Sequence, residues 1–228
     1  MLRSAGFALC FALLGLDQSL AQIPPSAAEL AGYQGLHAAA ARGDVATIRD
    51  LLAKRAPTGA RDAYQRTLLH VAAYRSQRDA MRALVAGGAD PNALENDRYD
   101  IVTIAAVAND LPTLALALEL GTNPRNVTSR YDGTALIAAA HLGHHEVVRM
   151  LIKAGAPLDH INNLGWTALI ESIVLGDGGP RHLATLRALV AAGANVNLAD
   201  RQGRTPVALA RAAGYQEMVS VLQAAGAR

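Results

Sequence analysis

The chain has 228 residues, of which 51% are apolar and only 4% aromatic, so helices are favoured over a β-sandwich with a bulky core. The formal net charge is +2 and no run of five like charges occurs, which excludes the electrostatic footprint of a nucleic-acid-binding protein. A mostly helical protein with no nucleic-acid partner is therefore expected.

Residues 1–21 have the three parts of a secretory signal peptide. Arg3 supplies the positive start, Ala5 to Leu16 forms a continuous apolar stretch, and small residues precede a cleavage point after Ala21. We predict cleavage there and a periplasmic or secreted protein. An uncleaved anchor is the alternative, but this stretch is shorter than the ~20 apolar residues of a spanning helix. No later segment is long enough, so no stable membrane span is expected in the mature chain, and residues 22–31 are predicted to be a linker.

Cys10 is the single cysteine and lies inside the apolar stretch. The mature chain would then have no thiol, which excludes disulfides, cysteine nucleophiles and thiolate metal sites. A lipoprotein anchored through Cys10 is the alternative. It would need small residues just before the cysteine, where Phe7 and Leu9 are bulky.

Two markers recur along the rest of the chain with one period. The first starts a helix and falls, at steps of 33 or 34 residues, on Thr67, Asp100, Thr134 and Thr167. The second is a glycine that suits the left-handed end of another helix, at Gly88, Gly121, Gly155, Gly193 and Gly226. A threonine hydroxyl can cap the first turn of a helix. The pattern predicts helix pairs that must stack to bury their apolar faces.

The repeated unit resembles the ankyrin family. The resemblance rests on Gly165-Trp166-Thr167-Ala168-Leu169 before the first helix, on Gly143 to Val148 between helices, and on Gly193 to Asn197 after the second helix. It covers residues 32–228 and implies an all-α ankyrin-repeat solenoid of about six helix-turn-helix repeats with hairpin-like tips, expected to be a monomer. The repeats are predicted at approximately 32–61, 62–94, 95–127, 128–161, 162–198 and 199–228.

Aromatic and arginine side chains share one register, at the tips and at the ends of the first helices. The resemblance implies that these positions line a concave face that binds a protein partner. Tyrosine, tryptophan and arginine are also the residues that most often carry interface energy. Packing of each tip against its neighbour is the alternative. The predicted partner-binding residues are Tyr64, Arg66, Tyr74, Arg75, Arg98, Tyr99, Arg130, Tyr131, His141 and Trp166.

Repeat five is longer than the others, because Thr167 and Thr205 are 38 residues apart. The extra residues fall around 176–182, between its two helices. Glu171 stands where other repeats carry an apolar residue, and a carboxylate there needs a partner. We predict that Glu171 anchors the inserted loop through Arg181 or His182, beside the Trp166 tip. A partly exposed Glu171 is the alternative.

Catalytic and cofactor signals are weak. The histidines His141, His144 and His145 have metal-ligand spacing, but Gly143 should break the helix between them. No nucleophile elbow, zinc motif or phosphate-binding loop is present, so we expect no enzyme, no metal and no cofactor. The main prediction is a non-catalytic protein-binding module. The alternative is a small-ligand or metal-binding protein that uses the inserted loop, and a hydrolase depending on Glu171 or Asp177 is a third class.

Overall fold

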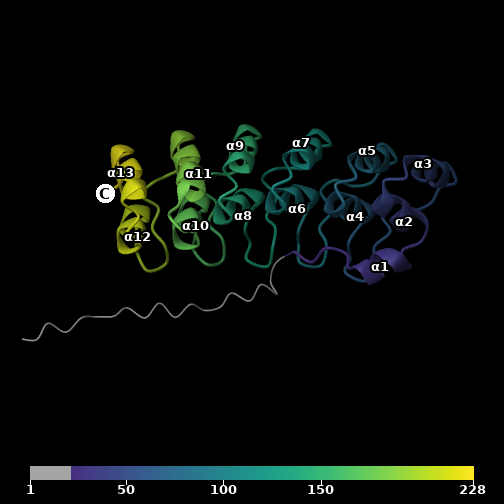
Figure 1. The fold of residues 1–228 in the computed structure, drawn as a ribbon, viewed down its shortest axis with the longest axis horizontal. Helices are drawn as coiled ribbons and strands as arrows, with labels where there is room; N and C mark the ends of the chain where they lie inside the picture. The colour runs from purple at the N-terminus through teal and green to yellow at the C-terminus, as the bar shows by residue number, and fades with distance from the viewer. Residues whose placement is uncertain (1–21) are drawn as a thin grey trace, which may run out of the picture.

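The computed structural model describes residues 22–228, so the predicted signal peptide lies outside the described residues. The described part is helical and elongated (Figure 1). None of its helices is both long and apolar enough to cross a membrane. The helices are α1 (Ala27–Gly32), α2 (Gly35–Arg42), α3 (Val45–Ala53), α4 (Leu68–Tyr74), α5 (Arg78–Ala86), α6 (Ile101–Val107), α7 (Leu111–Glu119), α8 (Ala135–His141), α9 (His145–Lys153), α10 (Ala168–Val174), α11 (Pro180–Ala191), α12 (Pro206–Ala212) and α13 (Gln216–Ala224).

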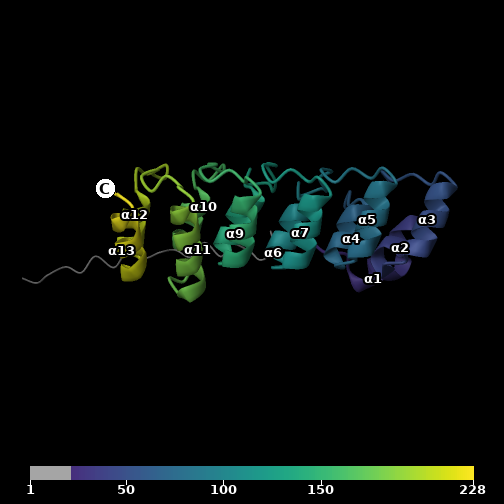
Figure 2. The same cartoon turned by 90° about the horizontal axis from the view of Figure 1, so that it is seen from above.

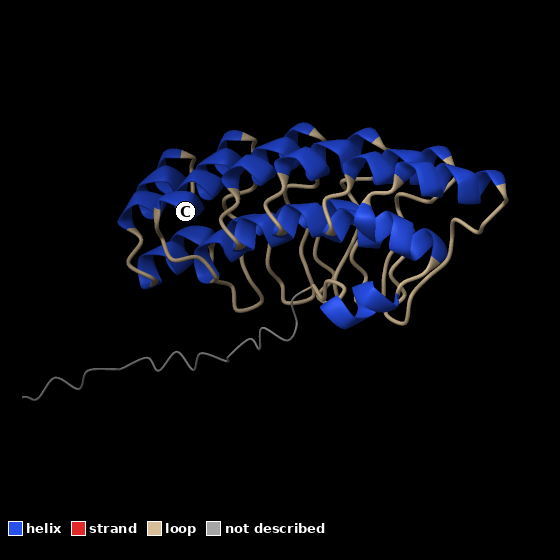
Figure 3. Cartoon of the chain, turned by 45° about the vertical axis from the view of Figure 1, so that its right-hand side comes forward, coloured by secondary structure: helices blue, strands red, loops and turns tan. Residues whose placement is uncertain are grey.

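Helices α2 to α13 form six antiparallel pairs that stack side by side. The first helices of the pairs make an inner row (α2, α4, α6, α8, α10 and α12), in which each contacts the next. The second helices make an outer row (α3, α5, α7, α9, α11 and α13), and each packs on its inner partner. Figure 2 shows long loops along one edge of the stack, and Figure 3 shows the two rows together.

Small side chains let the inner helices approach one another closely. Consecutive alanines are fully or almost fully buried in this row, for example Ala105 and Ala106 in α6 and Ala139 and Ala140 in α8. Larger residues from the outer row, such as Leu151 in α9, complete the core between the rows. A continuous core of this kind runs through every repeat. Single units cannot bury their apolar faces alone, so a stable stack needs such a core.

Helix ends follow the predicted pattern. The Thr134 hydroxyl accepts a hydrogen bond from the Ile137 N–H, and Thr167 caps α10 in the same way. Gly155 and Gly193 follow the outer helices with φ of +87° and +92°, a region that favours glycine. Both capping predictions are confirmed.

The segment predicted as a linker contains most of a helix. Ser26 and Glu29 form a reciprocal capping box that starts α1, with hydrogen bonds of 2.8 and 3.2 Å to each other's backbone N–H. This segment and α1 lie below the inner row at the N-terminal end of the stack (Figure 1). Residues 22–33 are therefore part of the folded surface, and their contacts decide which tips stay open.

Candidate functional site

Each inner helix from α4 onward is preceded by a turn that we call a tip. Tip two is Asp62–Arg66, tip three Glu95–Tyr99, tip four Thr128–Gly133, tip five Asn162–Trp166 and tip six Asp200–Arg204. In four of these the first side chain accepts hydrogen bonds from the N–H groups two and four residues later, as Asn162 does from Leu164 and Trp166, both at 3.0 Å. This local capping fixes the shape of the turn.

Backbone hydrogen bonds join successive tips. The N–H of Asn96 donates to the Tyr64 carbonyl at 3.1 Å, and the N–H of Asn163 donates to the Tyr131 carbonyl at 2.9 Å. Tips three and four are connected in the same way, because the N–H of Ser129 donates to the Arg98 carbonyl at 3.2 Å. The tips of repeats two to five therefore form one connected ledge, which presents its side chains without a large ordering cost on binding.

Several of the predicted residues lie on this ledge and reach solvent. Tyr64 is 40% exposed, and Tyr131 and Trp166 are partly exposed. Arg98 and Arg130 are exposed but form ion pairs between tips three and four, with Asp132 at 2.6 Å and with Asp97 respectively. Exposed pairs of this type contribute little stability, so both guanidinium groups remain available to a partner.

The remaining predicted residues lie elsewhere. Tyr74, Arg75 and His141 are at the far ends of α4 and α8 from the tips. Arg75 is exposed, whereas the other two are partly buried. The prediction was wrong for Tyr99, which is buried, and its backbone carbonyl is 2.9 Å from His70 Nε2. Its side chain supports the ledge from inside.

Arg66 is also not a surface residue, because the N-terminal segment covers it. Its Nε donates to Asp62 at 2.6 Å, its Nη1 to the Ile23 carbonyl at 3.1 Å, and its Nη2 to Glu29. The Tyr33 hydroxyl donates to the same Asp62 oxygen at 2.6 Å. Burial favours the neutral form of Asp62, but the hydrogen bonds from Tyr33 and Arg66 hold its pKa below the usual value. Arg66 is completely buried, so its predicted contact with a partner was wrong.

Three exposed apolar side chains on the ledge were not predicted. Val127, Ile161 and Leu164 are 36, 50 and 36% exposed, and they lie on or directly before tips four and five, which also carry Tyr131 and Trp166. A sequence signal for two of them exists, since Val127 and Ile161 directly precede the first residue of a tip. Exposed apolar side chains that gather on one surface mark interaction sites. We call the surface formed by these five residues together with Tyr64, Arg98 and Arg130 the tip face.

Glu171 is buried, as its register indicates, but its partners differ from those predicted. Its Oε1 accepts a hydrogen bond from Asn162 at 2.8 Å, and its Oε2 lies 3.8 Å from His141 Nδ1. Arg181 and His182 do not contact it, so the predicted anchoring role was wrong. Burial raises the pKa of Glu171 to about 7, and burial together with the nearby His182 lowers the pKa of His141.

His182 rather than Glu171 holds the inserted residues. Its Nδ1 lies 2.8 Å from an Asp177 oxygen, and its Nε2 lies 2.9 Å from the His141 carbonyl. Much of the insertion lengthens α11, which has 12 residues where the other outer helices have 9. The insertion follows the C-terminal end of α10, whereas Trp166 precedes the N-terminal end of α10. The insertion therefore does not lie beside the Trp166 tip, contrary to the prediction. Within residues 22–228 no three His, Cys, Asp or Glu side chains form a metal-binding group.

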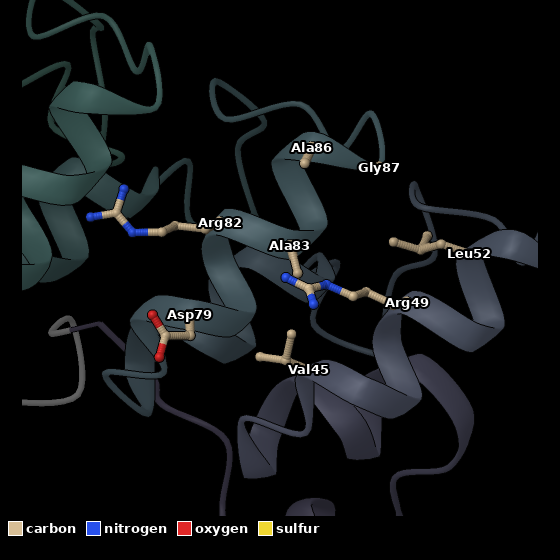
Figure 4. A pocket seen from close by; sticks show the side chains of 8 residues that line it. All are labelled: Val45, Arg49, Leu52, Asp79, Arg82, Ala83, Ala86 and Gly87. Carbon is tan, nitrogen blue, oxygen red and sulfur yellow. The ribbon is translucent and has the colours of Figure 1, made fainter.

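An open groove of about 640 Å³ lies on the other side of the molecule, between α3 and α5 (Figure 4). Val45, Leu52 and Ala83 line it, with Arg49 reaching across and Arg82 directed away toward Glu119 of α7. A similar groove lies between α9 and α11. The two grooves occupy corresponding gaps between neighbouring outer helices, so they arise from the stacking of repeats.

The stacked helix pairs and the connected tips define a repeat solenoid. Residues 5–95 and 102–200 match the family described as ankyrin repeats in three copies. The chain is 32% identical over 190 residues to the ankyrin repeat protein YahD of Escherichia coli (strain K12), across 83% of this chain and 94% of that one.

Solved structures agree with this assignment. An ankyrin repeat domain from Acinetobacter baumannii AYE is similar with a TM-score of 0.80 and 42% identity, over 85% of this chain and 98% of that one. The ankyrin repeat domain of Bcl-3 is similar with a TM-score of 0.75 and 27% identity, over 86 and 88% of the two chains. The chain belongs to the ankyrin-repeat family, and the predicted all-α solenoid is confirmed.

Proposed function

We propose that this chain is a non-catalytic binding module that recognises a protein partner through the tip face, in the periplasm or outside the cell. Ankyrin repeats generally mediate protein–protein interaction, which supports the class of function. The predicted signal peptide supports the location. The chain acts as a monomer that offers one preformed surface.

One observation carries the proposal. Leu164 on tip five and Ile161 directly before it are exposed apolar side chains close in sequence to Trp166, and the hydrogen-bonded ledge fixes the backbone of this tip. Burying such side chains against a partner contributes roughly 25 cal/mol per Å² of apolar surface. The exposed arginines Arg98 and Arg130 border the apolar part and would supply directional hydrogen bonds.

Capture experiments test this proposal. The full chain is immobilised and exposed to a periplasmic extract of its source, and bound proteins are quantified by mass spectrometry. We expect a variant carrying Tyr131→Ala, Ile161→Ala and Leu164→Ala to capture its specific partner at least about tenfold less well, because truncated interface anchors commonly cost 2 kcal/mol or more.

A matched control removes three exposed side chains from the outer row, with Arg149→Ala, Lys153→Ala and Arg187→Ala. This control is expected to capture the partner like the unchanged chain. Circular dichroism confirms that both variants remain folded. Equal capture by the tip-face variant, or loss of capture in the outer-row control alone, would contradict the proposal.

A further inference from the structure

Tips two and six contain the same local arrangement of an aspartate and an arginine. In tip six, Asp200 Oδ1 accepts from the N–H groups of Gln202 and Arg204 at 2.9 Å, and Asp200 Oδ2 accepts from Arg204 Nε at 2.7 Å. Tip two repeats these bonds, with 2.9 Å for both N–H contacts of its aspartate and 2.6 Å for the Nε contact of Arg66. The two arginines share these three contacts, but Arg204 Nη2 also lies 2.7 Å from Asp200 Oδ2, whereas Arg66 Nη2 binds Glu29.

In tip two this arrangement already holds a ligand, supplied by the chain itself. The two terminal nitrogens of Arg66 bind the Ile23 carbonyl at 3.1 Å and the Glu29 carboxylate. A planar guanidinium with several donors suits a carboxylate, and the pair is stronger than one between neutral groups. The N-terminal segment thus shows which chemistry an arginine at this position accepts, namely a carboxylate with a backbone carbonyl nearby.

In tip six the corresponding arginine is open. The Arg204 side chain is 46% exposed, while Asp200 beneath it is buried. Arg204 Nη1 has no hydrogen-bond partner within residues 22–228, because both contacts to Asp200 use other nitrogens. The nitrogen left open at tip six corresponds to Arg66 Nη1, which binds the Ile23 carbonyl at tip two, while Arg204 Nη2 contacts Asp200.

The charge around tip six is also not neutralised by another repeat. Arg98 and Arg130 are paired across tips three and four, but Arg201 forms no ion pair within residues 22–228. Its side chain lies directly on tip five, since a Cβ added to Gly165 would be 2.5 Å from Arg201 Cγ. Two arginines and one aspartate leave positive charge beside the apolar end of the tip face.

We propose that Arg204, assisted by Arg201, is a carboxylate-binding subsite for an acidic segment of the protein partner. The inference rests on the proposed function and extends it, because it assigns a chemistry to the partner. The apolar residues of tip five and the two arginines then form one surface, which fits a segment carrying an aspartate or glutamate next to apolar side chains. The segment Ile23 to Glu29 of this chain is the template for such a ligand.

Fluorescence anisotropy with a defined probe tests the subsite. The probe is an acetylated, fluorescein-labelled peptide of residues 22–33, titrated with the full chain, whose own copy of this segment keeps Arg66 occupied. We expect saturable binding that weakens at least about tenfold for the Arg204→Gln chain, and equally for a probe carrying Glu29→Gln, because each change removes a charge-assisted hydrogen bond. An Arg149→Gln chain is the control and should bind the probe unchanged.

Three outcomes would overturn the subsite. They are no saturable binding, equal binding by the Arg204→Gln and unchanged chains, and equal binding of the two probes. The capture experiment keeps this result separate from the proposed function. If the partner is still captured through Ile161 and Leu164 while the Arg204→Gln chain captures it equally well, the subsite is wrong and the tip face stands.

Discussion

Replacing Arg66 with methionine is expected to lower the free energy of unfolding by about 3 to 5 kcal/mol, because the change leaves the buried Asp62 carboxylate without its guanidinium partner. Asp62 and Glu29 would lose the guanidinium that binds both, and the Ile23 carbonyl would lose its donor. Residues 22–33 should detach from the inner row as a result. Urea unfolding followed by circular dichroism measures the loss of stability, and hydrogen exchange measures the release of α1.

Arg204→Met is the matched control for this change. Arg204 contacts its own aspartate through Nε as Arg66 does, and also through Nη2, but its side chain is 46% exposed and no segment of the part that the structure describes, residues 22–228, covers it. Its replacement is expected to change the free energy of unfolding by no more than about 1 kcal/mol, the upper range for exposed pairs. Equal losses for the two variants would show that the covering segment contributes nothing, which would contradict this account of Arg66.

Replacing Glu171 with glutamine is expected to remove a pH-dependent loss of stability. The pKa of Glu171 rises from 4.5 to about 7 on folding, so the folded chain binds a proton more tightly than the unfolded chain. The stability linked to this carboxyl group is fully present below pH 4.5 and is lost as the pH rises through about 7. A shift of this size corresponds to about 3 kcal/mol, taking 1.36 kcal/mol per pKa unit.

The measurement compares the unfolding free energies of the two chains at pH 4.5 and pH 8. The advantage of the glutamine variant over the unchanged chain should grow by about 3 kcal/mol between these values. The lowered pKa of His141 also makes stability depend on pH, in the opposite direction, but it does so in both chains. The difference between the two chains therefore reports the contribution of Glu171. Parallel pH curves for the Glu171→Gln and unchanged chains would contradict the prediction.

The sequence was sufficient to predict features that depend on the local geometry repeated in each unit. Thr134 and Thr167 start helices because their hydroxyls cap the first turn, and Gly155 and Gly193 end helices because their φ values are positive. Each property belongs to a few neighbouring residues, so the period of the sequence contains it. The helix pairs follow from the same signals.

Contacts between distant segments were not predictable in this way. Arg66 and Arg204 stand in the same sequence pattern, four residues after an aspartate and directly before a threonine. One is buried and the other open, because only tip two is covered by Glu29, which is 37 residues away in the sequence. The capping box of Ser26 and Glu29 indicates that α1 exists but not where it packs.

For Glu171 the sequence predicted the burial correctly but not the hydrogen-bond partner. Its burial follows from its place in the repeat, where Val71 and Leu209 are also buried. Its partner Asn162 lies nine residues earlier, on a tip that folds back beside α10, whereas the predicted partners Arg181 and His182 follow the other end of the helix. Arg181 and His182 lie at nearly the same distance along the sequence, so sequence distance did not single out Asn162, and the packing of tip five beside α10 decides the partner.

Site-specific photo-crosslinking tests the central claim most directly. A crosslinking amino acid is placed at Ile161 or Leu164 on the tip face, and at Lys153 or Arg187 on the outer row as controls, and each chain is irradiated with its captured partner. The account predicts covalent adducts with one partner from the two tip positions and none above background from the two outer positions. Adducts with that partner from the outer row, with none from the tips, would contradict binding through the tip face.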